Sequence, residues 1–253
     1  MPLSRVEYAY GYGVYESVRV NKGRIFFLAE HCRRLMNSAR VIGLEHNFQS
    51  GTVEKAVQEL VRQNQAVACN IKIMLIGGRA AEAASLEILC LNPLFPDRKL
   101  YKTGGKTITY RYEREFPAAK TLNMLPSYIA FKAAVNAGAY DALLVNRQDC
   151  ITEGTRSNFF GLRGRTIVSP PAEQILPGVT RAKVLAVAEK HDFQIVEQPV
   201  KQSELSQFDS LFITSTACKI LPLSNVDDRI FKITSEMREL MIAFDSFLEQ
   251  LAN

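Results

Sequence analysis

The sequence predicts a two-domain protein of mixed α/β (α+β) class. Its 253 residues are enough for one large domain or two small ones. In both halves, stretches typical of strands are interspersed with stretches in which apolar residues recur every three or four positions. The segment 92–97 between them carries two prolines, which disfavour regular structure on either side. We therefore expect an N-terminal domain over residues 1–92, a linker over 93–102 and a C-terminal domain over 103–253.

Local signals set the expected elements of the N-terminal half. The turn Asn21-Lys22-Gly23 separates two apolar runs, which predicts a hairpin. Gly43 ends the first stretch of helical spacing, and Ser50 can cap the second. The expected elements are a hairpin over 14–27, helices over 28–42 and from Ser50, and strands over 67–76 and 85–91.

The C-terminal half shows the same mixture. Gly138 ends one helical stretch, and Thr234 can cap a last helix with a wide apolar stripe. The turn Arg163-Gly164-Arg165 predicts a second hairpin. The expected elements are strands over 107–112, 141–146, 194–200 and 210–215, a hairpin over 158–169, and helices over 125–137, from Pro177-Gly178 and after Thr234.

Composition and charge exclude several functional classes. With 47% apolar and 23% charged residues, the chain has the composition of an ordinary globular protein. The formal charge of +5 is spread along the sequence, and the longest basic run is Arg33-Arg34. Nucleic-acid binding is therefore not expected, whereas a small anionic ligand is compatible with this charge.

The cysteines and the N-terminal residues indicate where the protein works. The closest two of the five cysteines, Cys69 and Cys90, are 21 residues apart, which leaves no zinc knuckle or redox CxxC motif. The histidines at 31, 46 and 191 are too far apart for a local metal motif, so no metal is expected. The start of the chain has no apolar signal region, and no stretch is long and apolar enough to span a membrane. We expect a cytoplasmic protein without membrane contacts.

Four segments of the second half could form one site for an anion and an imine. A Gly-Val-Thr sequence at a helix start favours phosphate, a hydroxyl-rich turn after a strand offers donors, and a lysine between strand and helix can act as a nucleophile. Each segment also has an ordinary structural interpretation as a surface lysine, turn, helix start or strand end. The segments are Ala119–Asn123, Thr152–Asn158, Leu176–Arg181 and Thr214–Ala217.

In their order and their sequences, these segments resemble those of the class IV aminotransferases, the fold-type IV pyridoxal-phosphate enzymes. That family includes branched-chain and D-amino-acid aminotransferases and aminodeoxychorismate lyase. It implies two α/β domains with the cofactor in the cleft between them, and usually a homodimer. The matches are GYGVYESVRV at 11–20, EHCRRL at 30–35, AKTLN at 119–123, ITEGTRSNFF at 151–160, and ILPGVTR at 175–181 followed by TSTA at 214–217.

The resemblance implies a role for each matching residue. Lys120 would form the Schiff base with pyridoxal 5′-phosphate and later move a proton, and Glu153 would bind the pyridine nitrogen. The phosphate would be held by Arg34, Val179, Thr180 and Thr216. The substrate would contact Tyr15 and the backbone of Ala217. Arg156 either binds an acidic substrate or forms a surface pair.

The implied reaction is transfer of an amino group between an amino acid, branched-chain-like L or D, and a 2-oxo acid. A lyase that releases pyruvate from 4-amino-4-deoxychorismate is the first alternative, and a non-catalytic cofactor-binding homologue is the second. The second is motivated by two departures from the family pattern, Tyr12 between Gly11 and Gly13 and Lys219 after the TSTA turn.

Overall fold

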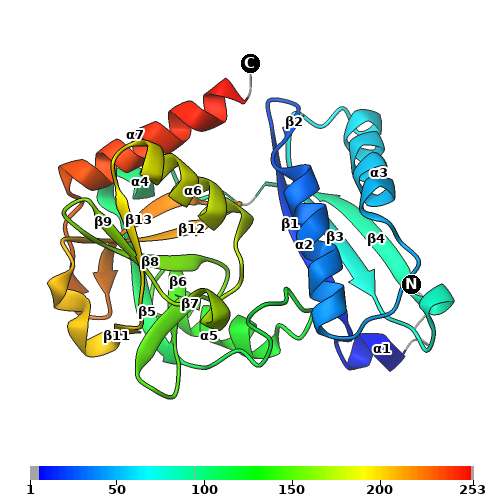
Figure 1. Cartoon of the computed structure of the whole chain (residues 1–253), viewed down its shortest axis with the longest axis horizontal. Coiled ribbons are helices and arrows are strands. Elements are labelled where there is room, and N and C mark those ends of the chain that lie inside the picture. The colour runs from blue at the N-terminus through cyan, green and yellow to red at the C-terminus, as the bar shows by residue number, and fades with distance from the viewer. Residues whose placement is uncertain (1–5, 94, 252–253) are drawn as a thin grey trace. The chain divides into compact units, whose positions relative to one another are not determined.

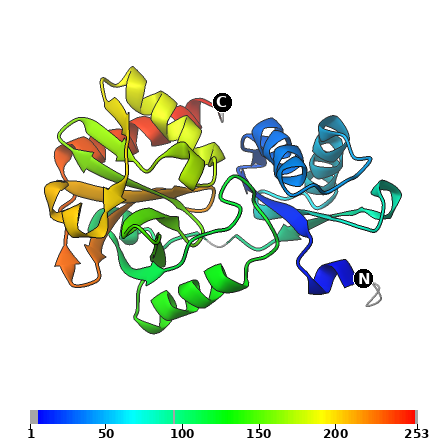
Figure 2. The same ribbon diagram turned by 60° about the horizontal axis from the view of Figure 1, so that its bottom comes forward.

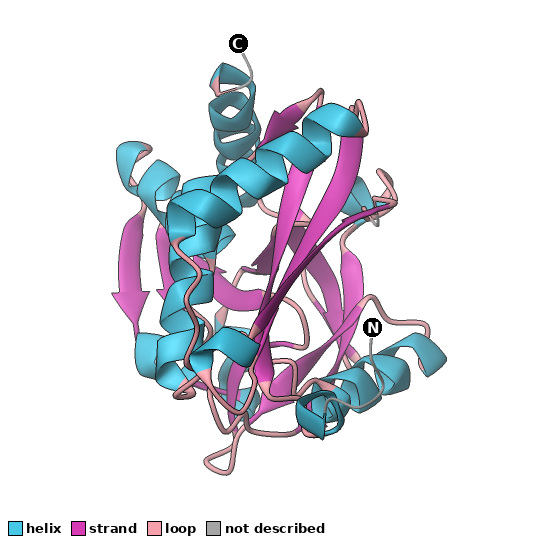
Figure 3. Cartoon of the chain, turned by 90° about the vertical axis from the view of Figure 1, so that its right-hand side faces the viewer, coloured by secondary structure: helices cyan, strands magenta, loops and turns pink. Residues whose placement is uncertain are grey.

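The chain divides into two compact units in a computed structural model that describes residues 6–93 and 95–251 (Figure 1). Unit 1 comprises Met1–Leu94 and Phe116–Met124, and unit 2 comprises Phe95–Glu115 and Leu125–Asn253. Both units combine helices with strands, which confirms the predicted α/β (α+β) class (Figure 3). The segment Phe116–Met124, hereafter the return segment, belongs to unit 1 although it lies beyond the expected linker. No local signal in the sequence indicates this return.

Unit 1 is a four-stranded antiparallel sheet in the order β2-β1-β3-β4, with α2 and α3 on one face (Figures 1 and 2). Its elements are α1 (Val6–Ala9), β1 (Gly13–Asn21), β2 (Arg24–Ile25), α2 (Leu28–Val41), α3 (Ser50–Gln63), β3 (Ala68–Ile76), the 3-10 helix η1 (Ala81–Ala83) and β4 (Ser85–Leu91).

Side chains on alternate positions of β1 point towards the helices and pack against them. Val14, Val18 and Val20 are fully buried and belong to the same core as Leu35 and Ala39 of α2. The expected hairpin is confirmed: Lys22 and Gly23 both have positive φ, 51° and 73°, as a tight hairpin turn requires. The face of β1 that carries Tyr15 is turned away from the helix-covered core.

Unit 2 contains a ten-stranded sheet in the order β10-β9-β8-β12-β13-β5-β6-β7-β11, with β14 paired to β13. Because β7 also pairs with β8, the six strands from β8 to β7 close into a ring. Its elements are α4 (Leu100–Thr103), β5 (Gly105–Arg111), α5 (Leu125–Asn136), β6 (Asp141–Val145), β7 (Cys150–Gly154), β8 (Asn158–Arg163), β9 (Thr166–Ser169), η2 (Ala172–Gln174), α6 (Val179–Lys190), β10 (Gln194–Glu197), β11 (Val200–Lys201), η3 (Gln202–Gln207), β12 (Ser210–Ser215), β13 (Lys219–Val226), β14 (Arg229–Ile230) and α7 (Ser235–Gln250).

Strands β6, β8 and β12 of the ring are buried on both faces along most of their length. Residues such as Leu143 and Phe159 share one core inside the ring. On the outer face, Phe160 and Phe212 stack with ring centroids 4.7 Å apart and belong to the core under α6 and α7. Burial on both faces accounts for the near-continuous apolar runs of these strands.

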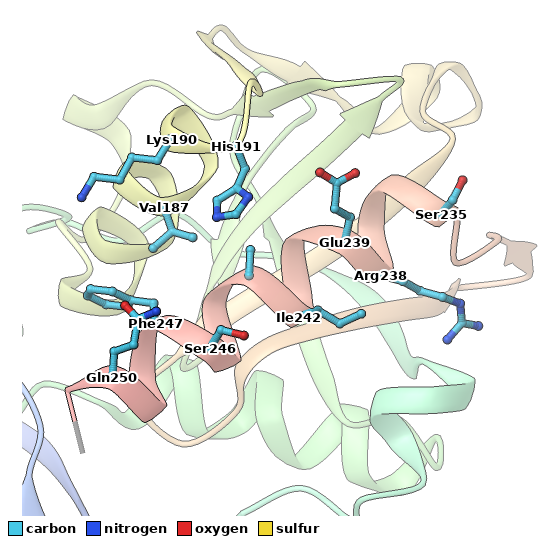
Figure 4. A pocket seen from close by; sticks show the side chains of 11 residues that line it. Val187, Lys190, His191, Ser235, Arg238, Glu239, Ile242, Ser246, Phe247 and Gln250 are labelled. Atoms are coloured by element: carbon cyan, nitrogen blue, oxygen red, sulfur yellow. The ribbon is translucent and has the colours of Figure 1, made fainter. Parts of the chain in front are cut away.

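Helices α6 and α7 lie side by side, and an open groove of about 580 Å³ follows their seam (Figure 4). Val187 and Ile242 supply apolar surface there, while Lys190 and Arg238 point outward at its rim (Figure 4). None of the predicted site residues lines this groove. Among the residues that the structure describes, no helix has both the length and the apolar character needed to cross a membrane.

The predicted cap of the last helix supplies a test of the fold. Thr234 has extended backbone angles, and its hydroxyl accepts a hydrogen bond of 3.3 Å from the Met237 N–H. We expect Thr234→Ala to lower the free energy of unfolding by about 1 kcal/mol, as measured by urea denaturation. Ser235→Ala is the control, because the exposed Ser235 bonds through its hydroxyl to the side chain of its neighbour Glu236 and does not cap the helix. Equal losses in the two variants would contradict the capping role.

Candidate active site

The predicted site residues fall into two groups, one in each unit. Tyr15, Arg34 and Lys120 belong to unit 1. The others belong to unit 2: Glu153, Arg156, Val179, Thr180, Thr216 and Ala217.

The return segment holds the backbone of Lys120 against β1 as an additional short strand. The Tyr15 N–H donates to the Lys120 carbonyl at 2.9 Å, and the Leu122 N–H donates to the Gly13 carbonyl at 2.8 Å. Val14 and Thr121 form an antiparallel bridge between these bonds. These contacts fix Lys120 at the beginning of β1.

A third element also holds Lys120. Its N–H donates a hydrogen bond of 3.1 Å to the hydroxyl of Ser38, which is fully buried on α2. The lysine backbone is therefore bound by a strand on one side and by a helix on the other. The backbone of Lys120 is therefore ordered before a ligand binds, and binding does not have to order it.

Two lysines share the aromatic ring of Tyr15. The Lys120 Nζ lies 4.4 Å from the ring centroid and the Lys72 Nζ lies 5.5 Å from it. Sequence reasoning did not select Lys72. Its place between Ile71 and Ile73 on a strand would have indicated the sheet face opposite the helices, which also carries Tyr15.

A buried charge cluster surrounds Arg34. Its Nε and Nη2 donate to the two carboxylate oxygens of Glu16 at 2.7 and 2.8 Å. Nδ1 of the buried His31 lies 2.7 Å from Glu16 Oε2. The bidentate pair orients the guanidinium plane of Arg34.

The two titratable neighbours of Arg34 have displaced pKa values. Burial opposes ionisation of Glu16, but Arg34 and His31 outweigh it and lower the pKa of Glu16 to about 2. Burial lowers the pKa of His31, although Glu16 acts in the opposite direction. At neutral pH His31 is therefore uncharged and donates its Nδ1–H to the ionised Glu16.

Glu153 owes its orientation to an irregularity in β7. The pairing of β6 with β7 matches Val145 with Ile151 and Leu143 with Gly154, so β7 contains one extra residue. Such a bulge changes the face to which the following side chains point. Ile151 lies inside the ring, whereas Glu153 pairs with Asn158 on the outer face.

The Glu153 carboxylate is buried and bonded at both oxygens. Arg114 Nη1 donates to Oε1 at 3.0 Å, and the Leu176 N–H donates to Oε2 at 3.1 Å. The sequence did not indicate Arg114, because the segment between β5 and the return segment carries several charges without periodicity. A carboxylate with a guanidinium and an amide donor favours its ionised form.

A polar row crosses three strands at this point. Glu153 lies opposite Asn158, which lies opposite Thr214, and all three side chains are buried. Asn158 Nδ2 donates to the Leu176 carbonyl at 2.8 Å. A Cβ on Gly178 would lie 2.0 Å from Asn158 Oδ1, so only glycine lets the chain pass this close to the row. Helix α6 therefore begins beside Asn158.

The start of α6 and the end of β12 offer donors to an anion. Gly178 precedes the helix without a side-chain cap, so N–H groups of the first turn, at Val179 and Thr180, face outward along the axis. The buried Thr214 hydroxyl has no hydrogen-bond partner among the described residues. This donor set, together with an ionised Glu153, fits a phosphate and a protonated ring nitrogen, the polar groups of pyridoxal 5′-phosphate.

The turn between β12 and β13 carries Thr216 and Ala217. The Ser215 hydroxyl accepts a bond of 3.1 Å from the Cys218 N–H, and the Tyr101 hydroxyl donates to the Cys218 carbonyl at 3.1 Å. Lys219, which departs from the family pattern, adopts a left-handed φ of 56° and pairs with Asp245. These contacts hold the turn from both ends.

Arg156 lies exposed in the turn between β7 and β8. Its guanidinium carbon is 3.8 Å from the ring centroid of Phe131 and 5.9 Å from that of Tyr140. This stacking orients the side chain in unit 2. Both expectations for Arg156, an acidic substrate and a surface contact, are compatible with it.

Comparison with known proteins identifies the family. Residues 13–226 match the model of the family described as "Amino-transferase class IV". The chain belongs to this family. It is therefore an aminotransferase-family enzyme, and this membership confirms the resemblance found in the sequence.

The individual relatives are named for different substrates. A D-alanine aminotransferase from Bacillus licheniformis is 33% identical over 229 residues, which cover 87% of this chain and 81% of that protein. A branched-chain amino acid aminotransferase from T.th., solved with pyridoxamine 5′-phosphate, has a TM-score of 0.87 and 26% identity, covering 98% of this chain and 88% of that one. A Legionella pneumophila protein provisionally named 4-amino-4-deoxychorismate lyase has a TM-score of 0.87 and 23% identity, and the match covers 97% of this chain and 94% of that one. The last likeness shows the fold alone.

The buried Glu16 supplies a stability test. Its pKa is depressed from an ordinary 4.5 to about 2, so its stabilising effect is present above pH 4.5 and is lost as the pH falls towards 2. We expect Glu16→Gln, which leaves Arg34 without its buried counter-charge, to lower the free energy of unfolding by about 3 kcal/mol at pH 7. Denaturant unfolding at pH 7 and at pH 3 measures this loss, which should be smaller at pH 3.

Glu59→Gln is the matched control. Arg62 and Gln63 also lower the pKa of Glu59 to about 2, but this pair lies exposed on α3. The free energy of unfolding of this control should be close to that of the wild type at both pH values. A Glu16→Gln variant that behaves like Glu59→Gln would show that the cluster does not stabilise unit 1.

Proposed function

We propose that this protein is a pyridoxal-phosphate-dependent aminotransferase that exchanges an amino group between an amino acid and a 2-oxo acid, with Lys120 as the lysine that holds the cofactor covalently. The observation that supports this most strongly is the setting of Lys120. Its backbone is bound by β1 and by Ser38, and its ammonium lies 4.4 Å from the centroid of the Tyr15 ring. A surface lysine has no need of such support.

The bound cofactor supplies an electron sink and a store for the amino group between the two half-reactions. Lys120 binds the cofactor and, once its amine is released, holds and moves a proton at Nζ. Glu153 would keep the ring nitrogen protonated, since Arg114 and the Leu176 N–H hold its carboxylate in the ionised form. Tyr15 limits the positions that the lysine amine can take.

The phosphate would be held by a guanidinium, backbone N–H groups and a hydroxyl. Arg34 would contribute a guanidinium whose plane is set by Glu16. Val179 and Thr180 would contribute N–H groups at the uncapped start of α6, and Thr216 a hydroxyl. Charge-assisted bonds of this kind suit a phosphate dianion.

The substrate would carry at least one carboxylate. Lys72 is half-buried, lies on the Tyr15 ring, and forms no ion pair with a described residue. It would bind a substrate carboxylate, with the Ala217 N–H and Arg156 as further donors. Relatives named for D-alanine and for branched-chain amino acids leave both L- and D-amino acids as candidate donors.

A lyase is the second candidate function. The chain and the Legionella protein provisionally named 4-amino-4-deoxychorismate lyase match over nearly their full lengths. The same lysine and the same carboxylate would serve in that reaction. Release of pyruvate without an amino acceptor separates it from transamination.

Helix α5 supports a homodimer. Leu125, Tyr128, Ile129 and Val135 are between 47% and 66% exposed, and spacings of four and seven residues place them along one side of the helix. One charged residue, Lys132, lies on the same side, four residues after Tyr128. A second copy of the chain would cover this surface.

We also place the protein in the cytoplasm, because all five of its cysteines are free.

The lysine assignment is tested with pyridoxal 5′-phosphate and single amino donors. Purified protein should develop a visible absorption band, and one of L-leucine, L-glutamate, D-alanine or D-glutamate should convert it. Lys120→Ala should lower turnover by at least about 100-fold, because it removes the nucleophile and the proton carrier. Lys72→Met is the control, expected to keep the band and lose affinity for the donor. Full turnover by Lys120→Ala would refute the assignment.

The same experiment separates the second candidate. If the band forms and none of the donors converts it, 4-amino-4-deoxychorismate is added without an amino acceptor and pyruvate is measured. Pyruvate release under these conditions replaces the aminotransferase proposal with the lyase.

The dimer is tested by light scattering after size-exclusion chromatography. Ile129→Lys should halve the measured mass, because it replaces an apolar side chain of this surface with a second charge beside Lys132. Ile230→Lys, on the exposed β14, should leave the mass unchanged. A wild-type protein that elutes as a monomer, or an Ile129→Lys variant that stays dimeric, contradicts this use of α5.

A further inference from the structure

We propose that Asp141 is a positioning residue for Glu153, which it holds through the turn between β7 and β8. The inference rests on the proposed role of Glu153. Asp141 is the first residue of β6, is 1% exposed, and forms no ion pair with a described residue. A carboxylate buried without a basic partner is costly unless hydrogen bonds satisfy it.

Three donors converge on the Asp141 carboxylate. Oδ1 accepts from the Ala142 N–H at 2.9 Å and from the Thr155 hydroxyl. Oδ2 accepts from the Ser157 hydroxyl at 2.8 Å. Two of the three donors therefore belong to the turn that directly follows Glu153.

The backbone of the turn is closed around the same carboxylate. The Gly154 N–H donates to the Ser157 carbonyl at 2.7 Å, and the Thr155 N–H donates to the Ala142 carbonyl at 3.0 Å. A Cβ on Gly154 would lie 2.8 Å from Asp141 Oδ2 and 2.2 Å from the Ser157 hydroxyl. The absence of a side chain at Gly154 lets Asp141 reach the turn.

The bulge in β7 connects Asp141 to Glu153. Gly154 pairs with Leu143, a residue of the inner core, whereas Glu153 pairs with Asn158 of the outer face. Asp141 binds the hydroxyls of Thr155 and Ser157, and the Ser157 carbonyl accepts from the N–H of Gly154, the residue that directly follows Glu153. These bonds fix the register of the turn, and this fixes Glu153, because a slip of the turn would carry Glu153 away from Arg114 and Leu176.

Charge is not required for this role, whereas hydrogen-bond geometry is. Asparagine at position 141 keeps Oδ1 as an acceptor, and the Ser157 hydroxyl can rotate to accept from the new amide. Asp141→Asn is therefore the conservative variant. Asp141→Ala removes all three bonds, and Ser157→Ala removes one of them without emptying the buried site.

The experiment is a double-mutant cycle with Glu153→Gln, read on purified protein loaded with pyridoxal 5′-phosphate. The readouts are the pH midpoint of the visible absorption band, the dissociation constant of the cofactor, and kcat and KM. Asp141→Ala and Ser157→Ala should lower kcat by about 10- to 100-fold and shift the midpoint in the direction that Glu153→Gln shifts it. In the Glu153→Gln background neither change should add a further shift of the midpoint. Asp141→Asn should have a midpoint and a kcat close to those of the wild type.

Thr109→Val is the control for a merely structural effect. The Thr109 hydroxyl donates to the Asp227 carboxylate at 2.8 Å, a similar bond on β5 that does not involve Glu153. This variant should leave the absorption midpoint unchanged. An unmoved midpoint in both Asp141→Ala and Ser157→Ala, or shifts that add to that of Glu153→Gln, would overturn the positioning role. A Glu153→Gln spectrum identical to the wild type would instead overturn the proposed role of Glu153 and the inference with it.

Discussion

The antiparallel pairing of residues 120–122 with the beginning of β1 is the interaction on which the candidate site of unit 1 depends. It joins chain segments about a hundred residues apart and fixes Lys120 by backbone bonds rather than by side-chain packing. Tyr15, which donates one of those bonds, carries the ring against which the lysine ammonium lies. The same pairing therefore determines where the Lys120 amine lies and which aromatic ring it contacts. The hydrogen bonds involve backbone atoms alone, so they do not depend on the chemical state of the amine.

The two buried glutamates follow one physical rule. Glu16 and Glu153 are both buried, and each binds an arginine and one further donor, an arrangement that favours the ionised carboxylate. Their use differs. Glu16 orients the guanidinium of Arg34, whereas Glu153 lies in a row with Thr214, whose buried hydroxyl has no partner among the described residues. The unused hydrogen-bonding capacity of this row is available to a ligand.

Elements with strong local signals could be predicted from the sequence. The turn at Lys22-Gly23, the helix ended by Gly43 and the cap at Thr234 are observed, since each depends on residues close in the chain. The family motifs named the candidate site residues, whose roles stay predictions. The return segment, the bulge in β7 and the contacts of Arg114 and Lys72 could not be predicted, because they arise from pairing between distant segments. Strand β13 escaped prediction because Pro222 lies in its middle, where proline normally argues against a strand.

The assembly of unit 1 from two stretches of chain has a consequence during synthesis. Until residue 122 has left the ribosome, the N–H of Tyr15 and the carbonyl of Gly13 have no strand beside them on that side. An open edge of this kind invites pairing with other chains. A fragment that stops at the end of β4 would keep its apolar core and yet expose this edge permanently. The segment that closes this edge also carries Lys120, so unit 1 is completed only when the proposed nucleophile has been synthesised.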